Sequence, residues 1–439
     1  MRQRNIFWFW LPLFASWLLM TAEGPIISAS INRLPNEVIM LAAFGIVNSL
    51  SVTIESPIIN LLATSTALVK DRPSYLLVRR FTIQWALALT AVAAIVAFTP
   101  VFDWIVTGLL DTPPEVAQWV RPGMQIMTLW SAAIAWRRFL QGVMIHFGET
   151  RKVAWGTAVR LLASGGTAVS LTLFSGWPGV IIAGTSLMAG VTAEALYATL
   201  AVRPLQKKYL ALDSPIAPGT PLTSRELFWF HLPLASTSLL ILLAQPMVTF
   251  SLARLDQPVA SLAAWPVVFQ IMLMARAAAL ALPEAVIALS ERPDAFQPLR
   301  RFSLNLALIM TGLMALFILT PLAAFYIYVV QDMTAVVGAL TESSLIYFLL
   351  FPALATFISW LRGLLINRRA TKAVNVGMAI NLAITASVLT IGLLARLPGL
   401  PTAAVALNAA AVGEILYLGW YTQRILPAET PLLRPVKAS

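Results

Sequence analysis

Long stretches without a charged side chain recur along this 439-residue chain. Each is close to the ~20 residues that a helix needs to cross a bilayer. Only 11% of the residues are charged, whereas the wetted surface of a soluble domain brings the charged fraction to about 25%. The apolar runs are continuous rather than alternating, which excludes a transmembrane β-barrel. The sequence therefore predicts an all-α, multi-pass protein of the plasma (cytoplasmic or inner) membrane.

Apolar runs between charged breaks define twelve predicted spans. The first six cover roughly residues 6–31, 38–69, 81–108, 116–146, 153–174 and 178–201, and the second six roughly 227–252, 259–289, 302–330, 338–366, 373–395 and 399–423. The predicted domains are an N-terminal six-helix bundle at 1–201, a cytoplasmic linker at 202–226, a C-terminal six-helix bundle at 227–423 and a cytoplasmic tail at 424–439.

Lysine and arginine side chains gather on one side of these spans. Of the 30, 21 fall on the side that holds the N-terminus, four on the opposite side and five within spans. Cytoplasmic loops of membrane proteins carry an excess of Lys and Arg, so both termini are expected in the cytoplasm. The net charge of +11 is then explained by topology, and no nucleic-acid partner is expected.

The two halves of the chain repeat one another at a shift of 221 positions. The matches include Phe7-Trp8-Phe9 with Phe228-Trp229-Phe230, Pro25 with Pro246, Arg33 with Arg254, Arg79-Arg80 with Arg300-Arg301, Thr99-Pro100 with Thr320-Pro321, Gly142 with Gly363 and, after one deletion, Glu194 with Glu414. Six spans per repeat is an even number, so both halves enter the membrane in the same direction. This predicts two parallel bundles related by a pseudo-twofold axis along the membrane normal.

Twelve spans in two halves, each opening with the Leu-Pro-Leu motif of 11–13 and 232–234, resemble the multidrug/oligosaccharidyl-lipid/polysaccharide exporter superfamily. Phe139-Leu140-Gln141-Gly142 is similar to a segment of its multidrug-and-toxin-extrusion (MATE) branch. Gln245-Pro246-Met247-Val248 and Leu68-Val69-Lys70-Asp71-Arg72 resemble the progressive ankylosis proteins. The resemblance implies a V-shaped pair of bundles, a central cavity and alternating access.

Two ionisable residues occupy equivalent positions in the middle of spans two and eight. Glu55 and Arg276 are 221 positions apart, so the repeat places them at one depth with opposite charge. A charge at mid-span costs at least ~2.5–3.5 kcal/mol and is normally paired and functional. If spans two and eight line the interface between the halves, as the resemblance implies, the two residues can meet. The pair would then either join the bundles permanently or act as a gate or substrate contact.

Three further arginines are assigned to gating or substrate contact because no partner in their own bundle is evident: Arg137, Arg138 and Arg362. Because five arginines lie within spans, a preference for anionic substrates is expected. Arg160 and Glu194 lie at similar depth on adjacent spans, and they are expected to form a structural ion pair.

Three carboxylates are candidates for binding the coupling ion. Glu414 is the copy of Glu194, but Asn381 stands where the first repeat has Arg160, so Glu414 is predicted to lack that partner. Glu23 is the only charge in span one, and Glu284 lies off-centre in span eight. His231 replaces Trp10 of the first repeat and is expected at the membrane interface.

Sequence motifs for catalysis are missing. There is no cysteine, no phosphate-binding glycine loop and no Ser-His-Asp set, so neither an enzyme nor a metal or other cofactor is expected. The predicted function is a secondary active transporter, an exporter driven by a proton or cation (sodium) gradient, with a small organic anion as substrate. It would act as a monomer in the lipid bilayer. The alternatives are a flippase for a lipid-linked precursor, a MATE-type antiporter of cationic drugs and a membrane-embedded lipid enzyme.

The orientation is testable with a single cysteine, because the natural chain has none. The variant Ser214→Cys places a thiol in the predicted cytoplasmic linker. We expect it to resist membrane-impermeant maleimide in intact cells and to react after permeabilisation. Labelling of intact cells would contradict the orientation.

Overall fold

The computed structural model describes residues 3–211, 221–290, 295–368 and 370–425, and these ranges contain helices and no strand. The helices of the first repeat are α1 (Gln3–Thr21), α2 (Glu23–Ile31), α3 (Glu37–Glu55), η1 (Ser56–Ile58), α4 (Leu61–Leu68), α5 (Arg72–Phe98), α6 (Val101–Asp103), η2 (Trp104–Leu109), α7 (Pro114–Ile126), η3 (Met127–Leu129), α8 (Trp130–His146), α9 (Thr150–Phe174) and α10 (Gly179–Tyr209).

The helices of the second repeat follow the same plan. They are α11 (Ser224–Leu242), α12 (Ala244–Leu252), α13 (Pro258–Ala275), α14 (Ala277–Leu280), α15 (Leu282–Leu289), α16 (Phe296–Leu319), α17 (Leu322–Ala324), η4 (Phe325–Val330), α18 (Ala335–Leu345), η5 (Ile346–Phe348), α19 (Phe351–Asn367), α20 (Thr371–Leu394) and α21 (Gly399–Ile425). Helices cover all twelve predicted spans, so the predicted fold class is confirmed. Ten of the described helices are long and apolar enough to cross a membrane, and a pair bent by 48° would make an eleventh.

The backbone repeats as the sequence does. Residues with positive φ recur at equivalent positions in the two halves: Asn36 and Gln257, Asp111 and Asp332, and, after the deletion, Gly176 and Arg396. The π-helical segments η2 and η4 also fall at equivalent positions, 221 residues apart. The repeat therefore preserves the turns and helix irregularities along with the spans.

The third span differs from its predicted range of 81–108. Helix α5 begins at Arg72 because Asp71 forms a capping box with Ser74, whose backbone N–H donates to Asp71 Oδ1 over 2.9 Å. It ends at Phe98, because Thr99 is extended and Pro100 has no N–H for a helical hydrogen bond. The ninth span shows the same break, since α16 ends at Leu319 before Thr320-Pro321.

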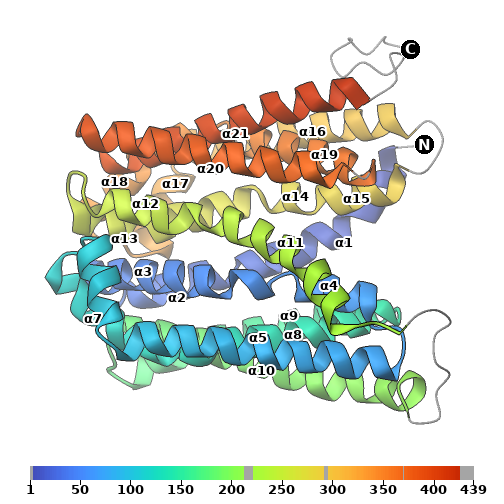
Figure 1. Ribbon diagram of the computed structural model, residues 1–439. Coiled ribbons are helices and arrows are strands. Elements are labelled where there is room, and N and C mark those ends of the chain that lie inside the picture. Colours follow the sequence, from blue (N-terminus) through green and yellow to red (C-terminus); the bar gives the residue numbers. More distant parts are fainter. Residues whose placement is uncertain (1–2, 212–220, 291–294, 369, 426–439) are drawn as a thin grey trace. The chain divides into compact units, whose positions relative to one another are not determined.

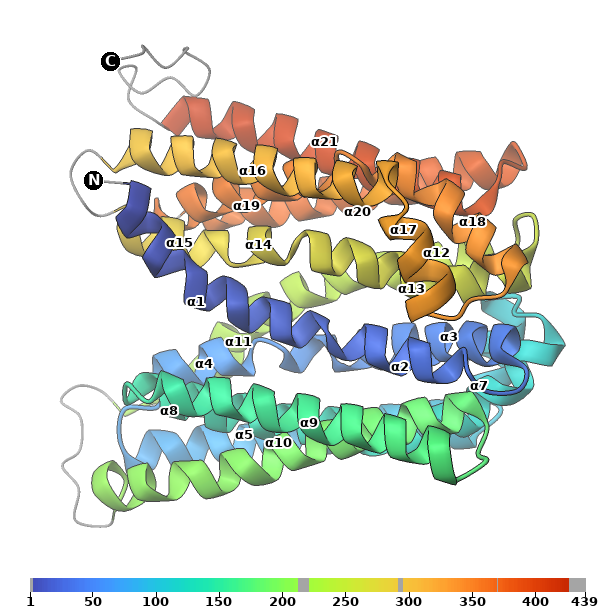
Figure 2. The same ribbon diagram turned by 180° about the vertical axis from the view of Figure 1, so that it is seen from behind.

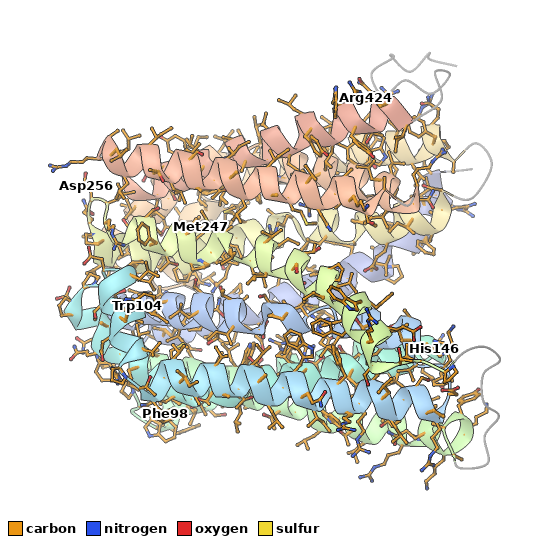
Figure 3. All side chains as sticks on the ribbon, viewed as in Figure 1. Phe98, Trp104, His146, Met247, Asp256 and Arg424 are labelled. Carbon is orange, nitrogen blue, oxygen red and sulfur yellow. The ribbon has the colours of Figure 1, made fainter. Side chains whose placement is uncertain are left out.

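The helices form two compact units. Unit 1 combines Met1–Thr21, Val268–Tyr326 and Thr341–Ser439, and unit 2 combines Ala22–Val267 and Ile327–Leu340. Within unit 2, α9 lies along α10, and within unit 1, α20 lies along α21 (Figures 1 and 2). In unit 2, His146 marks one end and Phe98 and Trp104 mark the other (Figure 3).

These units differ from the predicted bundles at their edges. Helix α1 packs on α14, α15 and α16 of the second repeat, whereas α11 packs on η1 and α4 of the first. The core of unit 1 accordingly includes Trp10 together with Leu282, Leu299 and Leu418. The predicted boundary at 202–226, of which residues 212–220 lie outside the described residues, does not separate the units. Each repeat's first helix joins helices of the other repeat.

Glycines mark where helices approach closely within unit 2. A Cβ added at Gly142 on α8 would lie 2.5 Å from the backbone oxygen of Leu62 on α4. We expect Gly142→Ala to lower the thermal stability of the detergent-solubilised protein, because overpacking costs about 1–3 kcal/mol. Gly166→Ala is the matched control, since nothing lies within 4 Å of the added Cβ. Equal melting temperatures for the two variants would contradict the close packing.

Candidate functional site: buried ion pairs in each unit

A buried carboxylate on the sixth span organises the interior of unit 2. Glu194 on α10 is only 1% exposed. Arg137 Nη1 lies 2.9 Å from its Oε2, and Gln141 Nε2 donates to its Oε1 over 2.8 Å. Arg137 and Gln141 are four residues apart on α8, a spacing that places both on one helix face.

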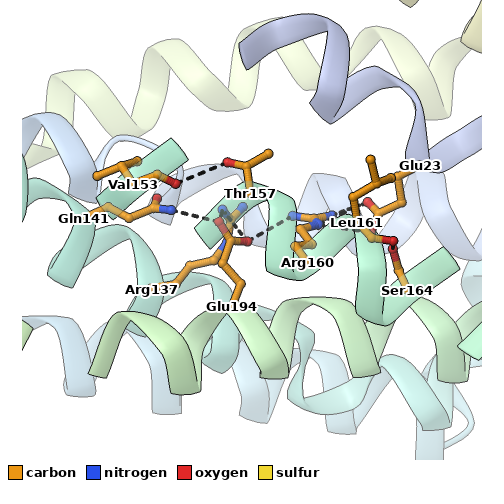
Figure 4. A network of polar contacts seen from close by, with 9 residues as sticks. All are labelled: Glu23, Arg137, Gln141, Val153, Thr157, Arg160, Leu161, Ser164 and Glu194. Carbon is orange, nitrogen blue, oxygen red and sulfur yellow. Dashed lines mark hydrogen bonds and ion pairs between the residues drawn. The ribbon is translucent and has the colours of Figure 1, made fainter. Parts of the chain in front are cut away.

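Arg160 on α9 extends this network to the first span (Figure 4). Its Nε donates to Glu23 Oε1 over 3.1 Å and its Nη2 to Glu23 Oε2 over 2.6 Å, and its Nη1 lies 3.8 Å from Glu194 Oε2. Gly190 leaves room for the Glu23 carboxylate, because a Cβ there would lie 3.2 Å from Glu23 Oε1. Arg160 thus links α2, α9 and α10 within one unit.

Unit 1 contains the corresponding carboxylate. Glu414 on α21 is fully buried. Arg362 on α19 lies 2.6 Å from Glu414 Oε1 through Nη2, and Asn381 on α20 donates to Oε2 over 2.9 Å. Arg362 is the copy of Gln141, and Asn381 is the copy of Arg160. Each unit therefore holds a sixth-span carboxylate with groups from its fourth and fifth spans, and each carboxylate has at least one guanidinium partner.

Glu55 and Arg276 lie at interruptions of the second and eighth spans. Glu55 is the last residue of α3, directly before η1, and Arg276 separates α13 from α14. The two residues belong to different units. Glu55 is 7% exposed and its Oε2 accepts no hydrogen bond from the described residues, and Arg276 Nε is likewise buried without a hydrogen bond there.

A side-chain N–H binds a backbone carbonyl at each interruption. The indole Nε1–H of Trp10 donates to Ala278 O over 3.0 Å in unit 1. His231 is its copy, and its Nε2–H donates to Pro57 O over 2.9 Å in unit 2. The accepting residues are also copies of one another, 221 positions apart.

The predicted interfacial position of His231 is wrong. The side chain is fully buried, its ring lies edge-on to Phe81 and Trp85, and its Nδ1 lies 2.9 Å from Thr64 Oγ1. The equivalence of Trp10 and His231 was visible in the sequence as two ring N–H donors at one position. Their acceptors were not visible, because α1 and α11 leave the helices of their own repeats.

Three of the sequence assignments change. Arg137 and Arg362 were predicted to lack partners, and the structure pairs them with Glu194 and Glu414, so that prediction is wrong. Glu414 was predicted to bind the coupling ion because it was expected to lack a charged partner. In the structure it forms an ion pair with Arg362. Sequence spacing could not show these contacts, because the rotation of each helix about its axis depends on packing.

The remaining candidates differ in exposure. Arg160 does contact Glu194, although its shorter contact is with Glu23. Both oxygens of Glu23 accept hydrogen bonds from this guanidinium. Arg138 is partly buried, forms no ion pair within the described residues, and its buried Nε has no hydrogen bond there. Glu284 lies exposed on α15. No group of three or more His, Asp or Glu that could hold a metal occurs among the residues described.

Comparisons with known proteins identify the fold. No family model and no curated protein matches the chain. An inward-facing multidrug-resistance MATE-family transporter of the MOP superfamily matches with a TM-score of 0.68 and 12% identity over 92% of this chain and 94% of that one. The chain has a MATE-like fold.

Two further structures extend the comparison. A MOP superfamily transporter from Pyrococcus furiosus, described as having a binding pocket of reverse polarity, matches with a TM-score of 0.68 and 13% identity over 96% of each chain. The lipid II flippase MurJ matches with a TM-score of 0.69 and 13% identity over 96% of this chain and 88% of its own. The MATE-like fold is therefore shared by proteins that carry different substrates, and the substrate must be argued from the residues.

The pair in unit 1 can be tested by a double-mutant cycle. Removing one member of a buried ion pair leaves an uncompensated charge and costs about 3–5 kcal/mol, whereas removing both costs less. We expect Glu414→Gln and Arg362→Gln each to lower the melting temperature, and the double variant to be more stable than either one. Asp103→Asn is the control, because the Asp103–Arg121 pair is exposed and worth at most about 1 kcal/mol. Additive losses in the double variant would show that the two charges do not interact.

Proposed function

We propose that this protein is a secondary active transporter that exports a small organic anion by alternating access, driven by a proton or cation gradient. The fold supports the transport mode, since MATE-family transporters with this fold have been solved in inward-facing and outward-facing conformations. The gradient is a sufficient energy source, because one elementary charge that crosses 100 mV releases about 2.3 kcal/mol.

The observation that carries the substrate class is a pair of arginines without carboxylate partners. Arg138 in unit 2 and Arg276 in unit 1 form no ion pair within the described residues, and a buried Nε on each has no hydrogen bond there. Structural arginines in a membrane are normally paired, as Arg137, Arg160 and Arg362 are. Unpaired guanidiniums at mid-span therefore favour an anionic substrate over a cationic drug.

A lipid-linked substrate is the second candidate. Unit 2 contains a cavity of about 410 Å³ lined mainly by apolar residues, among them Pro25, Ile26, Val169 and Leu173, with Arg33 at its edge. Val169 and Leu173 are exposed on the surface of α9. An apolar cavity beside exposed apolar residues and one cation would suit an acyl chain with an anionic headgroup, as a flippase requires.

Transport into inside-out vesicles tests the proposal. We expect ATP-independent uptake of labelled small carboxylates or phosphate esters that collapses when the ion gradients are dissipated. Arg138→Gln and Arg276→Gln should each reduce the initial rate about tenfold or more, because each removes the unpaired guanidinium of its own unit. Arg151→Gln, a change at an exposed helix start, should leave the rate unchanged.

Two outcomes would contradict an anion exporter. Robust transport of a cationic dye that is insensitive to both arginine substitutions would place the protein among the cation antiporters. Translocation of a fluorescent anionic lipid across proteoliposomes, without uptake of any soluble anion, would favour the flippase.

A further inference from the structure

Several polar atoms without partners gather inside unit 2, where α3 ends against α8. They are Glu55 Oε2, Ser56 Oγ, Trp130 Nε1, Arg137 Nε and Arg138 Nε, and none meets hydrogen-bond geometry with the described residues. The Trp130 indole N–H nevertheless lies close enough to the Glu55 carboxylate to stabilise its negative charge. Glu55 and Trp130 are less than one-tenth exposed. Buried polar groups normally have partners, because leaving one unsatisfied costs its full desolvation. Three of the five atoms are N–H donors, so the cluster presents more donors than acceptors.

The charges around these atoms balance. The interior of unit 2 contains three carboxylates and three guanidiniums, which are Glu23, Glu55, Glu194, Arg137, Arg138 and Arg160. Arg160 pairs with Glu23, and Arg137 pairs with Glu194. Glu55 and Arg138 are left over, and they form no ion pair with each other, although each lies within the electrostatic reach of the other.

Few other groups can compensate for a charge on Glu55. From α11, His231 approaches the same interruption, but both of its ring nitrogens already have partners in Pro57 O and Thr64 Oγ1. Helix α12 carries no ionisable residue, the arginines of α5 lie within its first turns, and Arg121 of α7 is paired with Asp103. Glu55 is therefore the one unpaired carboxylate that faces the donor cluster among the residues described.

We propose that these donors bind the negative group of the transported anion, and that Glu55 takes up one proton from water when the anion binds. The side chains of Arg137, Arg138 and Trp130 would each donate an N–H to the anion. An anion added to a neutral cluster next to the Glu55 carboxylate would be repelled in a medium of low dielectric constant. Protonation of Glu55 removes that repulsion and converts an unsatisfied acceptor into a donor. Arg138 is partly exposed, which gives the ligand a way to the cluster.

This inference rests on the proposed function for the substrate class and adds its coupling to protons. Because linkage is reciprocal, a proton that favours anion binding is itself bound more tightly when the anion is present. Anion and proton would then cross the membrane together. A divalent anion with one proton still carries one negative charge, so an inside-negative membrane potential favours its exit. The proton itself would leave against an inward proton gradient, so this inference narrows the energy source of the proposed export to the membrane potential.

The sign of the pH dependence follows from this linkage. Above the range in which Glu55 titrates, each unit by which pH falls should raise the affinity up to about tenfold, since one proton is taken up per anion. At lower pH, where Glu55 is protonated before the anion arrives, the affinity should level off. Glu55→Gln mimics the protonated state, so it should bind with the high affinity at every pH.

The experiment measures binding of [¹⁴C]succinate and of [³⁵S]sulfate to the purified full-length protein in nanodiscs between about pH 6.5 and 8.5, a range in which both ligands are dianions and do not titrate themselves. A pH-sensitive dye in weakly buffered solution measures proton uptake in parallel. The expected result is tighter binding at low pH with about one proton taken up per anion. Glu55→Gln should abolish both the slope and the uptake, whereas Glu55→Asp should keep both. Arg138→Gln should weaken binding at least tenfold at every pH, and Glu342→Gln, on the exposed face of α18, should behave as wild type.

Each contrary result has its own meaning. Wild-type binding that does not change with pH, or a slope that persists in Glu55→Gln, would overturn the proton linkage while the proposed anion transport stands. Failure of both anions to bind at millimolar concentration would show that the donor cluster holds only water and would overturn the site. If vesicles take up anions although the purified protein binds neither ligand, the proposed function stands without this binding site. Uptake of cations alone would contradict both the binding site and the proposed anion export.

Discussion

Every backbone N–H and C=O within a bilayer must find a partner inside the protein, because lipid offers none. The second and eighth spans are interrupted at Glu55 and Arg276, and ring N–H groups of His231 and Trp10 bind the carbonyls of Pro57 and Ala278 nearby. To form these hydrogen bonds, α1 must pack on α14 and α11 must pack on η1. Each unit therefore requires a helix from the other repeat, and neither half of the sequence is complete by itself.

The same requirement governs the buried charges. Glu194 and Glu414 would be untenable as isolated ions, and each has a guanidinium within 3.0 Å. The partners have diverged since the repeat arose: Arg137, Gln141 and Arg160 surround Glu194, whereas Arg362 and Asn381 hold Glu414. The position of the arginine has moved along the fourth span, but the carboxylate has kept a counter-ion. What the two units share is a buried sixth-span carboxylate that has a guanidinium counter-ion.

Sequence reasoning reached the fold and the repeat, because these depend on composition and spacing along one chain. It failed where the answer depends on helix rotation and on helices exchanged between repeats. The pairing of Arg137 with Glu194 needs one particular face of α8 to turn towards α10, and spacing alone does not select it. The bond from Trp10 to Ala278 joins residues 268 positions apart. One signal was available: Arg362 stands at the position of Gln141, so both could have been placed beside the sixth-span carboxylate.

A helix is interrupted at position 55 and at position 276, whereas the side chains at these two positions differ in charge. Both lie two residues before a carbonyl that a ring N–H binds, at an interruption that occurs in both repeats. The fold therefore accepts either sign of charge at this position and does not explain the choice. Elsewhere the buried charges are matched within their own unit, as Glu194 and Glu414 show. A buried charge that the fold neither requires nor neutralises is best explained by a ligand, which is why Glu55, rather than the paired Glu23 or Glu414, is the carboxylate that we assign to coupling.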